Sequence, residues 1–173
     1  MHDIELKLLD LFDRERGNHQ QVSNIIRNHG DQVNFTGVNG PIFNLLLDMR
    51  PFFTIGHVIE MLRVGFSLDH PNNRGTVHRA FMKRINEQCS TEMIEILELL
   101  CSSANFIETL PKNHLLDYIF QSDICVNCDV LKLLLKYDKT KRIKIALLMN
   151  CNKIICNNLQ QFHNELYKLI INS

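Results

Sequence analysis

A short apolar phrase returns four times along the chain, and this repetition limits the possible folds more than any other feature of the sequence. The corresponding residues of its copies are Ile26, Leu62, Leu100 and Leu135. They are 36, 38 and 35 residues apart. A period of this length excludes leucine-rich repeats and lies close to helical repeats of about 33 and 34 residues. We therefore expect stacked helical units that bury one continuous core.

The spacing of apolar residues is helical throughout, and no stretch alternates apolar and polar residues over the length of a strand. The pattern predicts an N-terminal helix over residues 3–16, which Gly17 ends. It also predicts a helix over residues 153–172 that caps the stack. The fold class is therefore all-α, with a single domain over residues 1–173 and repeats over residues 17–149.

The predicted C-terminal helix carries the most regular apolar stripe of the chain. The stripe consists of Ile155, Leu159, Phe162, Leu166 and Leu169. An end unit exposes the apolar face that a missing neighbour would cover, so we expect this stripe to cover the preceding helices. The residues expected beneath it are Val130, Leu133, Leu134, Ile145 and Leu148. The alternative is a dimer seam or a helix that binds a partner.

The residues around the first two copies resemble the ankyrin repeat. Gly30-Asp31-Gln32-Val33-Asn34 and Gly65-Phe66-Ser67-Leu68-Asp69 stand at its Gly-Ala-Asp-Val-Asn-like turn. Thr76-Val77-His78-Arg79-Ala80 stands at its Thr-Pro-Leu-His-x-Ala turn. In the third unit Ser103-Ala104-Asn105-Phe106 takes the place of the first turn, and the match weakens towards the C-terminus. The resemblance implies an ankyrin-repeat solenoid of about four degenerate repeats with N- and C-terminal capping helices.

The repeat pattern also predicts roles for single residues. Gly30 and Gly65 are expected to adopt a left-handed conformation at a helix end, where a glycine carries no steric cost. Ser103 replaces such a glycine, so its turn is expected to be strained. His78 is expected to hydrogen-bond backbone across repeats rather than to catalyse.

The sequence lacks the motifs that carry common enzyme chemistry. It has no phosphate-binding glycine loop, no nucleophile elbow and no His-Glu-x-x-His zinc motif. Cys125 and Cys128 have the spacing of a metal knuckle or a redox pair, but no second tight cysteine pair accompanies them. The other cysteines, Cys89 and Cys101 among them, are expected to be reduced and mostly buried. We expect no metal, no cofactor and no enzymatic activity.

Charge is balanced overall but uneven along the chain. Nineteen Lys+Arg face nineteen Asp+Glu, which argues against a surface built for nucleic acid or for a membrane. No stretch has the length of a membrane span, and the N-terminus is acidic, unlike a secretory leader. Residues 89–130 carry a net charge of −6 and residues 131–173 a net charge of +6. The basic residues from 132 to 144 fit a solvated edge, a contact with an acidic partner, a contact with nucleic acid, or a nuclear-import signal at residues 139–142.

The composition and architecture are similar to those of viral ankyrin proteins. Eighteen Asn and eighteen Ile indicate an A/T-rich genome, as in many viruses. The resemblance is to the truncated inhibitor-of-NF-κB-like proteins of polydnaviruses, called vankyrins, and to the host-range ankyrin proteins of poxviruses. It implies a monomeric module in the host cytoplasm, or alternatively the nucleus, that binds a Rel/NF-κB-type host factor and suppresses immune signalling. Cellular inhibitors of this type carry an N-terminal paired-serine degradation signal and an acidic tail. Here the first serine is Ser23 and the end is a predicted helix, which implies resistance to signal-induced destruction.

In the ankyrin register, loop tips and first helices offer a concave face to another protein. The residues predicted to bind a partner are Phe35, Thr36, His70, Asn72, Asn73, Arg74, Lys112, Lys139, Lys141 and Arg142. Phe35 is an anchor candidate, or alternatively packs against the neighbouring loop. The alternative functions are a ubiquitin-ligase adaptor, because the segment from Leu110-Pro111 to Phe120 faintly resembles an F-box, and a host-range factor that binds another host protein.

Overall fold

The computed structural model describes residues 2–13, 18–49, 53–111, 117, 127–154, 167–168 and 171–172. These residues are mostly helical, which confirms the all-α class. The helices are α1 (Asp3–Asp13), α2 (His19–Asn28), α3 (Ile42–Asp48), α4 (Ile55–Arg63), α5 (Thr76–Glu87), α6 (Thr91–Ser103), α8 (Cys128–Tyr137) and α9 (Arg142–Ile154). The predicted N-terminal helix is seen as α1, and the apolar stripe of the predicted C-terminal helix lies outside the described residues.

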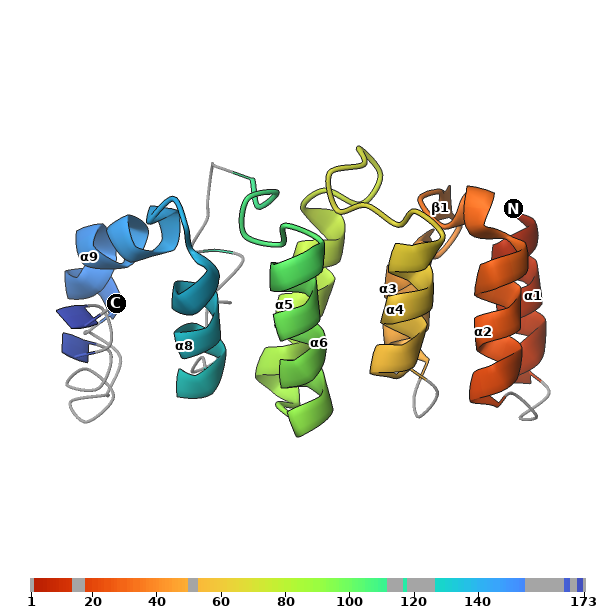
Figure 1. Cartoon of the computed structure of the whole chain (residues 1–173), viewed down its shortest axis with the longest axis horizontal. Coiled ribbons are helices and arrows are strands. Elements are labelled where there is room, and N and C mark those ends of the chain that lie inside the picture. The colour runs from red at the N-terminus through yellow and green to blue at the C-terminus, as the bar shows by residue number, and fades with distance from the viewer. Residues whose placement is uncertain are drawn as a thin grey trace.

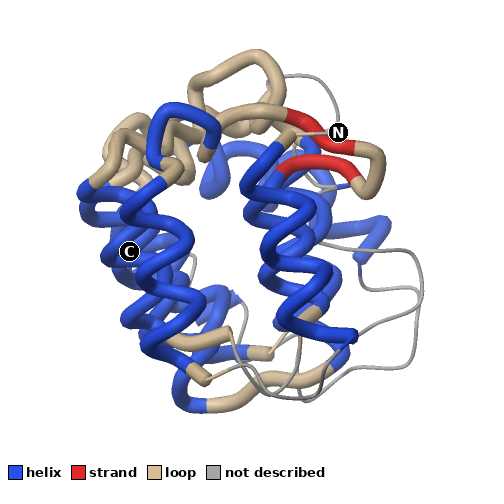
Figure 2. The backbone as a smooth tube through the Cα atoms, turned by 90° about the vertical axis from the view of Figure 1, so that its right-hand side faces the viewer, coloured by secondary structure: helices blue, strands red, loops and turns tan. Residues whose placement is uncertain are grey.

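The helices form two layers along the long axis of the molecule (Figure 1). Helices α2, α4, α6 and α8 pack successively in one layer, and α1, α3 and α5 pack successively in the other. Viewed along the stack, the two layers stand side by side, with longer connections at one end (Figure 2). No helix in the described part of the chain has the length and apolar character needed to span a membrane.

Side-chain caps explain where two helices of the layer formed by α2, α4, α6 and α8 begin. Asn18 accepts a hydrogen bond from the backbone N–H of Gln21 at 2.9 Å, and the Gln21 side chain accepts one from the Asn18 N–H. Ser90 caps α6 by accepting from the Met93 N–H at 3.2 Å. Because the first N–H groups of a helix have no partner within it, these caps fix the starts of α2 and α6.

One apolar core runs through both layers from Ile4 in α1 to Leu147 in α9. A row of phenylalanines connects neighbouring units within it. The ring of Phe43 lies 6.3 Å from that of Phe81, which lies 6.0 Å from that of Phe106. Burial of such side chains supplies most of the stability of a stack whose helices are too short to be stable alone.

A small hairpin interrupts the helical pattern, and no alternation of apolar and polar residues in the sequence indicates it. Strands β1 (Thr36–Gly37) and β2 (Gly40–Pro41) pair antiparallel, with Thr36 opposite Pro41. Each strand has two residues, which is too short for an alternating pattern to be visible. A 3-10 turn (Gly30–Gln32) precedes the hairpin.

The glycines at the helix ends confirm one prediction and contradict another. Gly65 has φ +98°, as expected, and an added Cβ would meet no atom there, so only the backbone conformation favours glycine. Gly30 is not left-handed, and the prediction for it was wrong. A Cβ at Gly30 would lie 2.6 Å from the Cβ of Val64, so glycine there permits close packing of two units.

The turn after α6 has a different register from the one predicted. Ser103 ends the helix, and the left-handed residue is Asn105, with φ +52°. Asn tolerates this conformation better than most residues. The strain expected at Ser103 is therefore absent, because the chain places its positive φ two residues later.

Candidate binding surface

The longer connections between units all emerge on the same side of the molecule, at the top of Figure 1. We call this side the loop edge. It consists of residues 36–41, 64–75, 104–111 and 138–141. Three buried or half-buried polar side chains connect one of these segments to the next, and their partners lie about one sequence period away.

Asn34 makes the first of these connections. Its side-chain amide donates to the Gly65 carbonyl at 2.8 Å, and its Oδ1 accepts from the Ser67 N–H at 2.9 Å. The same oxygen accepts from Nδ2 of Asn73 at 2.9 Å. Asn34 thus satisfies backbone groups of the next loop that would otherwise lack partners.

His78 makes the second connection, and its cross-unit hydrogen bond confirms the prediction made for it. Its Nδ1 accepts from the Gly75 N–H, so Nε2 carries the proton and donates to the Phe106 carbonyl at 3.0 Å. Thr109 Oγ1 also lies 3.0 Å from Nε2. Burial lowers the pKa of His78 to about 4, although the hydrogen bond to Phe106 opposes this shift, and the Arg74 charge lowers the pKa further. The ring is therefore neutral at pH 7.

Arg142 makes the third connection. Its guanidinium donates to the carbonyls of Ile107 and Glu108, both at 3.2 Å, and to that of Leu110 at 2.9 Å. Asp138 caps α9 by accepting from the backbone N–H groups of Arg142 and Lys144. The fourth connection of the loop edge is thereby fixed to the third.

A buried carboxylate fixes the hairpin to the first helix. Glu5 is fully buried and accepts hydrogen bonds from the backbone N–H groups of Val38 and Asn39, at 3.1 and 2.9 Å, and from the Asn39 side chain. A Cβ at Gly37 would overlap this carboxylate. The burial of Glu5 was not predicted from the sequence, because its position in an amphipathic helix gives no sign of it.

The predicted binding residues fall into three groups. Phe35, Thr36, Arg74, Lys139 and Lys141 are exposed on or beside the loop edge. His70, Asn72 and Arg142 are half-buried, and Asn73 is fully buried. Lys112 lies outside the described residues.

Asn73 and Arg142 have structural roles instead of a free surface. The Asn73 amide donates to Asn34 and to the Ser67 carbonyl, so its side chain cannot reach a partner. The Arg142 guanidinium is occupied by three carbonyls of the preceding loop. Phe35 is 41% exposed and stacks on His2 at 4.6 Å, so one face of its ring is covered by the chain itself.

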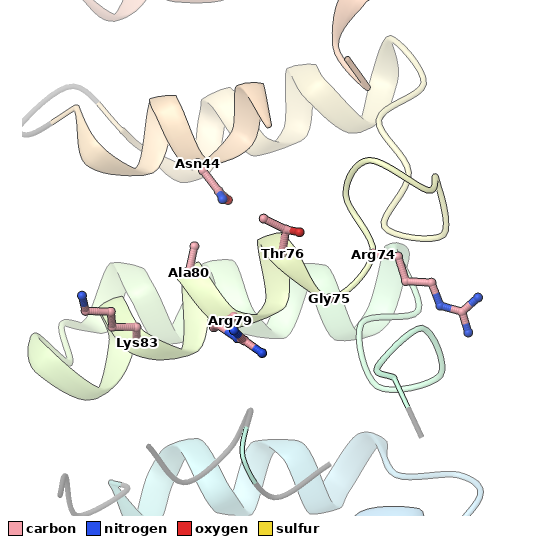
Figure 3. A pocket seen from close by; sticks show the side chains of 7 residues that line it. All are labelled: Asn44, Arg74, Gly75, Thr76, Arg79, Ala80 and Lys83. Atoms are coloured by element: carbon pink, nitrogen blue, oxygen red, sulfur yellow. The ribbon is translucent and has the colours of Figure 1, made fainter. Parts of the chain in front are cut away.

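A cavity of about 420 Å³ lies between α3 and α5, next to the loop edge (Figure 3). We call it the α3–α5 cavity. Its lining residues are Asn44, Arg74, Gly75, Thr76, Arg79, Ala80 and Lys83. Figure 3 shows Asn44 pointing from α3 towards Thr76 and Ala80, with Arg74 and Lys83 towards the two ends of α5. Arg74 is the one residue of this lining that was predicted from the sequence to bind a partner. The position of a cation such as Arg79 or Lys83 on a helix does not reveal a cavity beside that helix.

Two cysteine side chains in the described part of the chain, those of Cys101 and Cys89, differ in their exposure. Cys101 is buried, as predicted, and burial raises the pKa of its thiol to about 12, with Glu108 and Glu98 contributing. Cys89 is exposed, which contradicts the prediction of burial, because it lies in the connection before α6 and not on a core face. The partial burial that its thiol still has, together with the nearby Asp129 charge, raises the pKa of Cys89. Within the described ranges, no three His, Cys, Asp or Glu side chains gather as a metal site would require. Cys125 and the side chain of Cys128 lie outside the described part.

Comparisons of the chain with protein-family models, with curated proteins and with solved structures found no match.

Proposed function

We propose that the chain is a non-enzymatic protein-binding module of the ankyrin-repeat type. It presents to a partner protein its loop edge and the surfaces of α3 and α5 that line the α3–α5 cavity. The observation that carries this proposal is the set of connections made by Asn34, His78 and Arg142. Their partners lie 28 to 39 residues away along the chain, close to the sequence period of 35 to 38 residues. Each of these three side chains thus ties one unit to the next.

This arrangement suits binding because it holds the loops in place before a partner arrives. A loop that is already ordered loses less conformational entropy on association, which leaves more of the contact energy as affinity. The exposed residues of the loop edge are then positioned by a scaffold of buried polar groups. This combination of a rigid scaffold and exposed loop residues is typical of binding surfaces.

The proposed partner is a host protein of the Rel/NF-κB type, with suppression of immune signalling in the host cytoplasm as the consequence. The support for this partner is the resemblance of the sequence to viral ankyrin proteins. No described feature favours the ubiquitin-ligase adaptor, since Leu110 of its supposed motif is buried and its carbonyl accepts from Arg142.

Affinity purification of the tagged chain from host cells, followed by mass spectrometry, tests this function. Two variants should accompany it: the loop-edge pair Lys139→Glu/Lys141→Glu and, as a matched control, Arg63→Glu/Lys132→Glu on the exposed surface of α4 and α8. We expect Rel-type proteins that are lost with the loop-edge pair and kept with the control. Ubiquitin-ligase subunits in their place would favour the adaptor, and a set of proteins that neither pair changes would contradict the proposed surface.

A further inference from the structure

The α3–α5 cavity is rimmed by positive charge. Arg74, Arg79 and Lys83 line it, and its described lining residues include no carboxylate. Asp69 lies 3.8 Å from Arg74 and Glu87 lies 3.9 Å from Lys83, at the outer limit of an ion pair. The cations of both pairs are more than half exposed. Exposed pairs of this kind contribute little, so an incoming anion replaces them at small cost. Arg79 also has an interaction within the chain, which the anion has to replace.

We propose that this cavity binds an acidic peptide segment of the partner protein, an inference that rests on the proposed binding function. The spacing of the cations defines the segment. Arg79 and Lys83 are one helical turn apart, which corresponds to about 6 Å along α5. Alternate residues of an extended peptide are about 6.6 Å apart. A segment with Asp or Glu at alternate positions therefore matches the two cations.

The length of the cavity sets the length of the segment. Thr76 and Lys83 are seven positions apart in α5, so a helical rise of 1.5 Å per residue gives about 10 Å between them, and Arg74 lies in the connection before the helix. An extended peptide covers this stretch of α5 with about three residues. Two carboxylates on one side of such a segment reach Arg79 and Lys83, while Arg74 meets its end beside the loop edge.

Asn44 favours a peptide over other anions. Its Oδ1 is buried and accepts no hydrogen bond within the described structure, although its amide points towards α5 (Figure 3). Rotation about the Cβ–Cγ bond, which is soft for Asn, turns this oxygen to the cavity. A peptide backbone supplies N–H donors for it, whereas the phosphates of a nucleic acid supply acceptors alone.

The number and kind of side chains also argue against a nucleic acid. Proteins that bind DNA through its backbone commonly make about 6–10 phosphate contacts, and this cavity has three cations. Single strands are further held by aromatic side chains on which bases stack, and the part of the cavity lining that the structure describes has no aromatic side chain. The observations thus favour carboxylates on a peptide.

Fluorescence anisotropy with a labelled peptide of about nine residues, glutamate at alternate positions, tests the inference on the full chain. We expect binding that weakens about tenfold or more in Arg79→Gln/Lys83→Gln, as loss of charge-assisted hydrogen bonds requires. The exposed pair Arg74→Gln/Lys83→Gln provides a second variant with little risk to folding, and circular dichroism checks both. Arg63→Gln/Lys132→Gln is the matched control and should bind like the unchanged chain.

Four outcomes would overturn the inference. They are absence of binding to the glutamate peptide, equal binding of its glutamine counterpart, equal loss in the control pair, and equal or tighter binding of a labelled DNA strand of similar length. Competition by low-millimolar inorganic phosphate at constant ionic strength would point to a small-anion site and would also overturn it. If these occur while partner capture still depends on the loop edge, the proposed function stands without the acidic segment.

Discussion

At the scale of single residues, the molecule uses buried polar groups to hold its loops. A carboxylate as buried as Glu5 is costly unless hydrogen bonds replace the lost water, and three N–H donors of the hairpin do so. The neutral ring of His78 serves the next loop in a similar way. These groups make the loop conformation depend on few side chains, and two predictions follow from them.

Gly37→Ala should lower the free energy of unfolding by about 1–3 kcal/mol, because the new Cβ would overlap the Glu5 carboxylate and force the hairpin to move. Denaturant unfolding measures this. Gly56→Ala is the control, because Gly56 is exposed in α4 and an added Cβ would lie in ordinary contact, 3.6 Å from Oγ1 of Thr54. This substitution should raise the free energy of unfolding by about 0.4–1 kcal/mol. Equal effects of the two substitutions would show that Gly37 and Glu5 are not in close contact.

His78 should make stability depend on pH. Its pKa is about 4 in the folded chain and near 6.5 in the unfolded chain, so protonation favours unfolding. Its contribution is complete above pH 6.5 and is lost as the pH falls to about 4, by roughly 3 kcal/mol in total. Denaturant unfolding between pH 7 and 4 should show a flatter pH dependence for His78→Gln than for the unchanged chain. Parallel profiles would contradict a neutral, buried His78.

At the scale of elements, the helices were predictable and the turns between them were predictable only in part. Apolar residues at helical spacing, such as those around Ile26 and Leu100, indicate a helix because that spacing places them on one buried face. The turn after α6 was misplaced because Asn105, and not the residue aligned with glycine, adopts the positive φ. Such a choice depends on local packing, which one sequence does not reveal.

The binding surface was predicted less well than the helices. Loop register placed Arg74, Lys139 and Lys141 on the surface, where they are exposed. It did not separate them from Asn73, because burial of a polar loop residue depends on which neighbouring loop contacts it. The α3–α5 cavity is formed by two helices more than 30 residues apart in sequence, and no local pattern describes their separation.

Arg142→Met should weaken the attachment of α9 to the loop-edge segment 104–111. Three carbonyls lose their donor, and the expected loss is about 1–3 kcal/mol in the free energy of unfolding. Chemical denaturation followed by circular dichroism measures it. Lys139→Met removes an equal charge from an exposed position in the connection before α9 and should change stability by less than about 0.5 kcal/mol. A similar loss in both variants would assign the effect to charge and not to the hydrogen bonds.

At the scale of the whole molecule, the chain behaves as a row of units that depend on their neighbours. The core is continuous, and each connecting side chain reaches into the adjacent unit. At the C-terminal end, Val130, Leu133 and Leu134 are buried, whereas Ile145 and Leu148 are 52% and 45% exposed. The described part of the stack thus ends on α9, where two of the five residues expected beneath the C-terminal stripe are exposed.

Deletion of residues 154–173 should therefore cause aggregation or a loss of cooperativity in unfolding. The apolar stripe predicted for this segment would no longer be available to α9, and burial of each large apolar side chain contributes about 1.5–3 kcal/mol. Light scattering and denaturant unfolding distinguish the outcomes. A soluble, equally stable monomer that has lost partner binding would support a partner-binding helix in place of a cap.

The central claim is that the loop edge and the side of α5 that lines the α3–α5 cavity form one surface for a partner protein. Hydrogen–deuterium exchange of the chain, alone and in complex with the partner recovered by affinity purification, tests it most directly. The account predicts slower exchange on binding in residues 36–41, 64–83, 104–111 and 138–141, with α2 and α6 unchanged. Slower exchange confined to α2, α4, α6 or α9, with the loop edge unchanged, would contradict it.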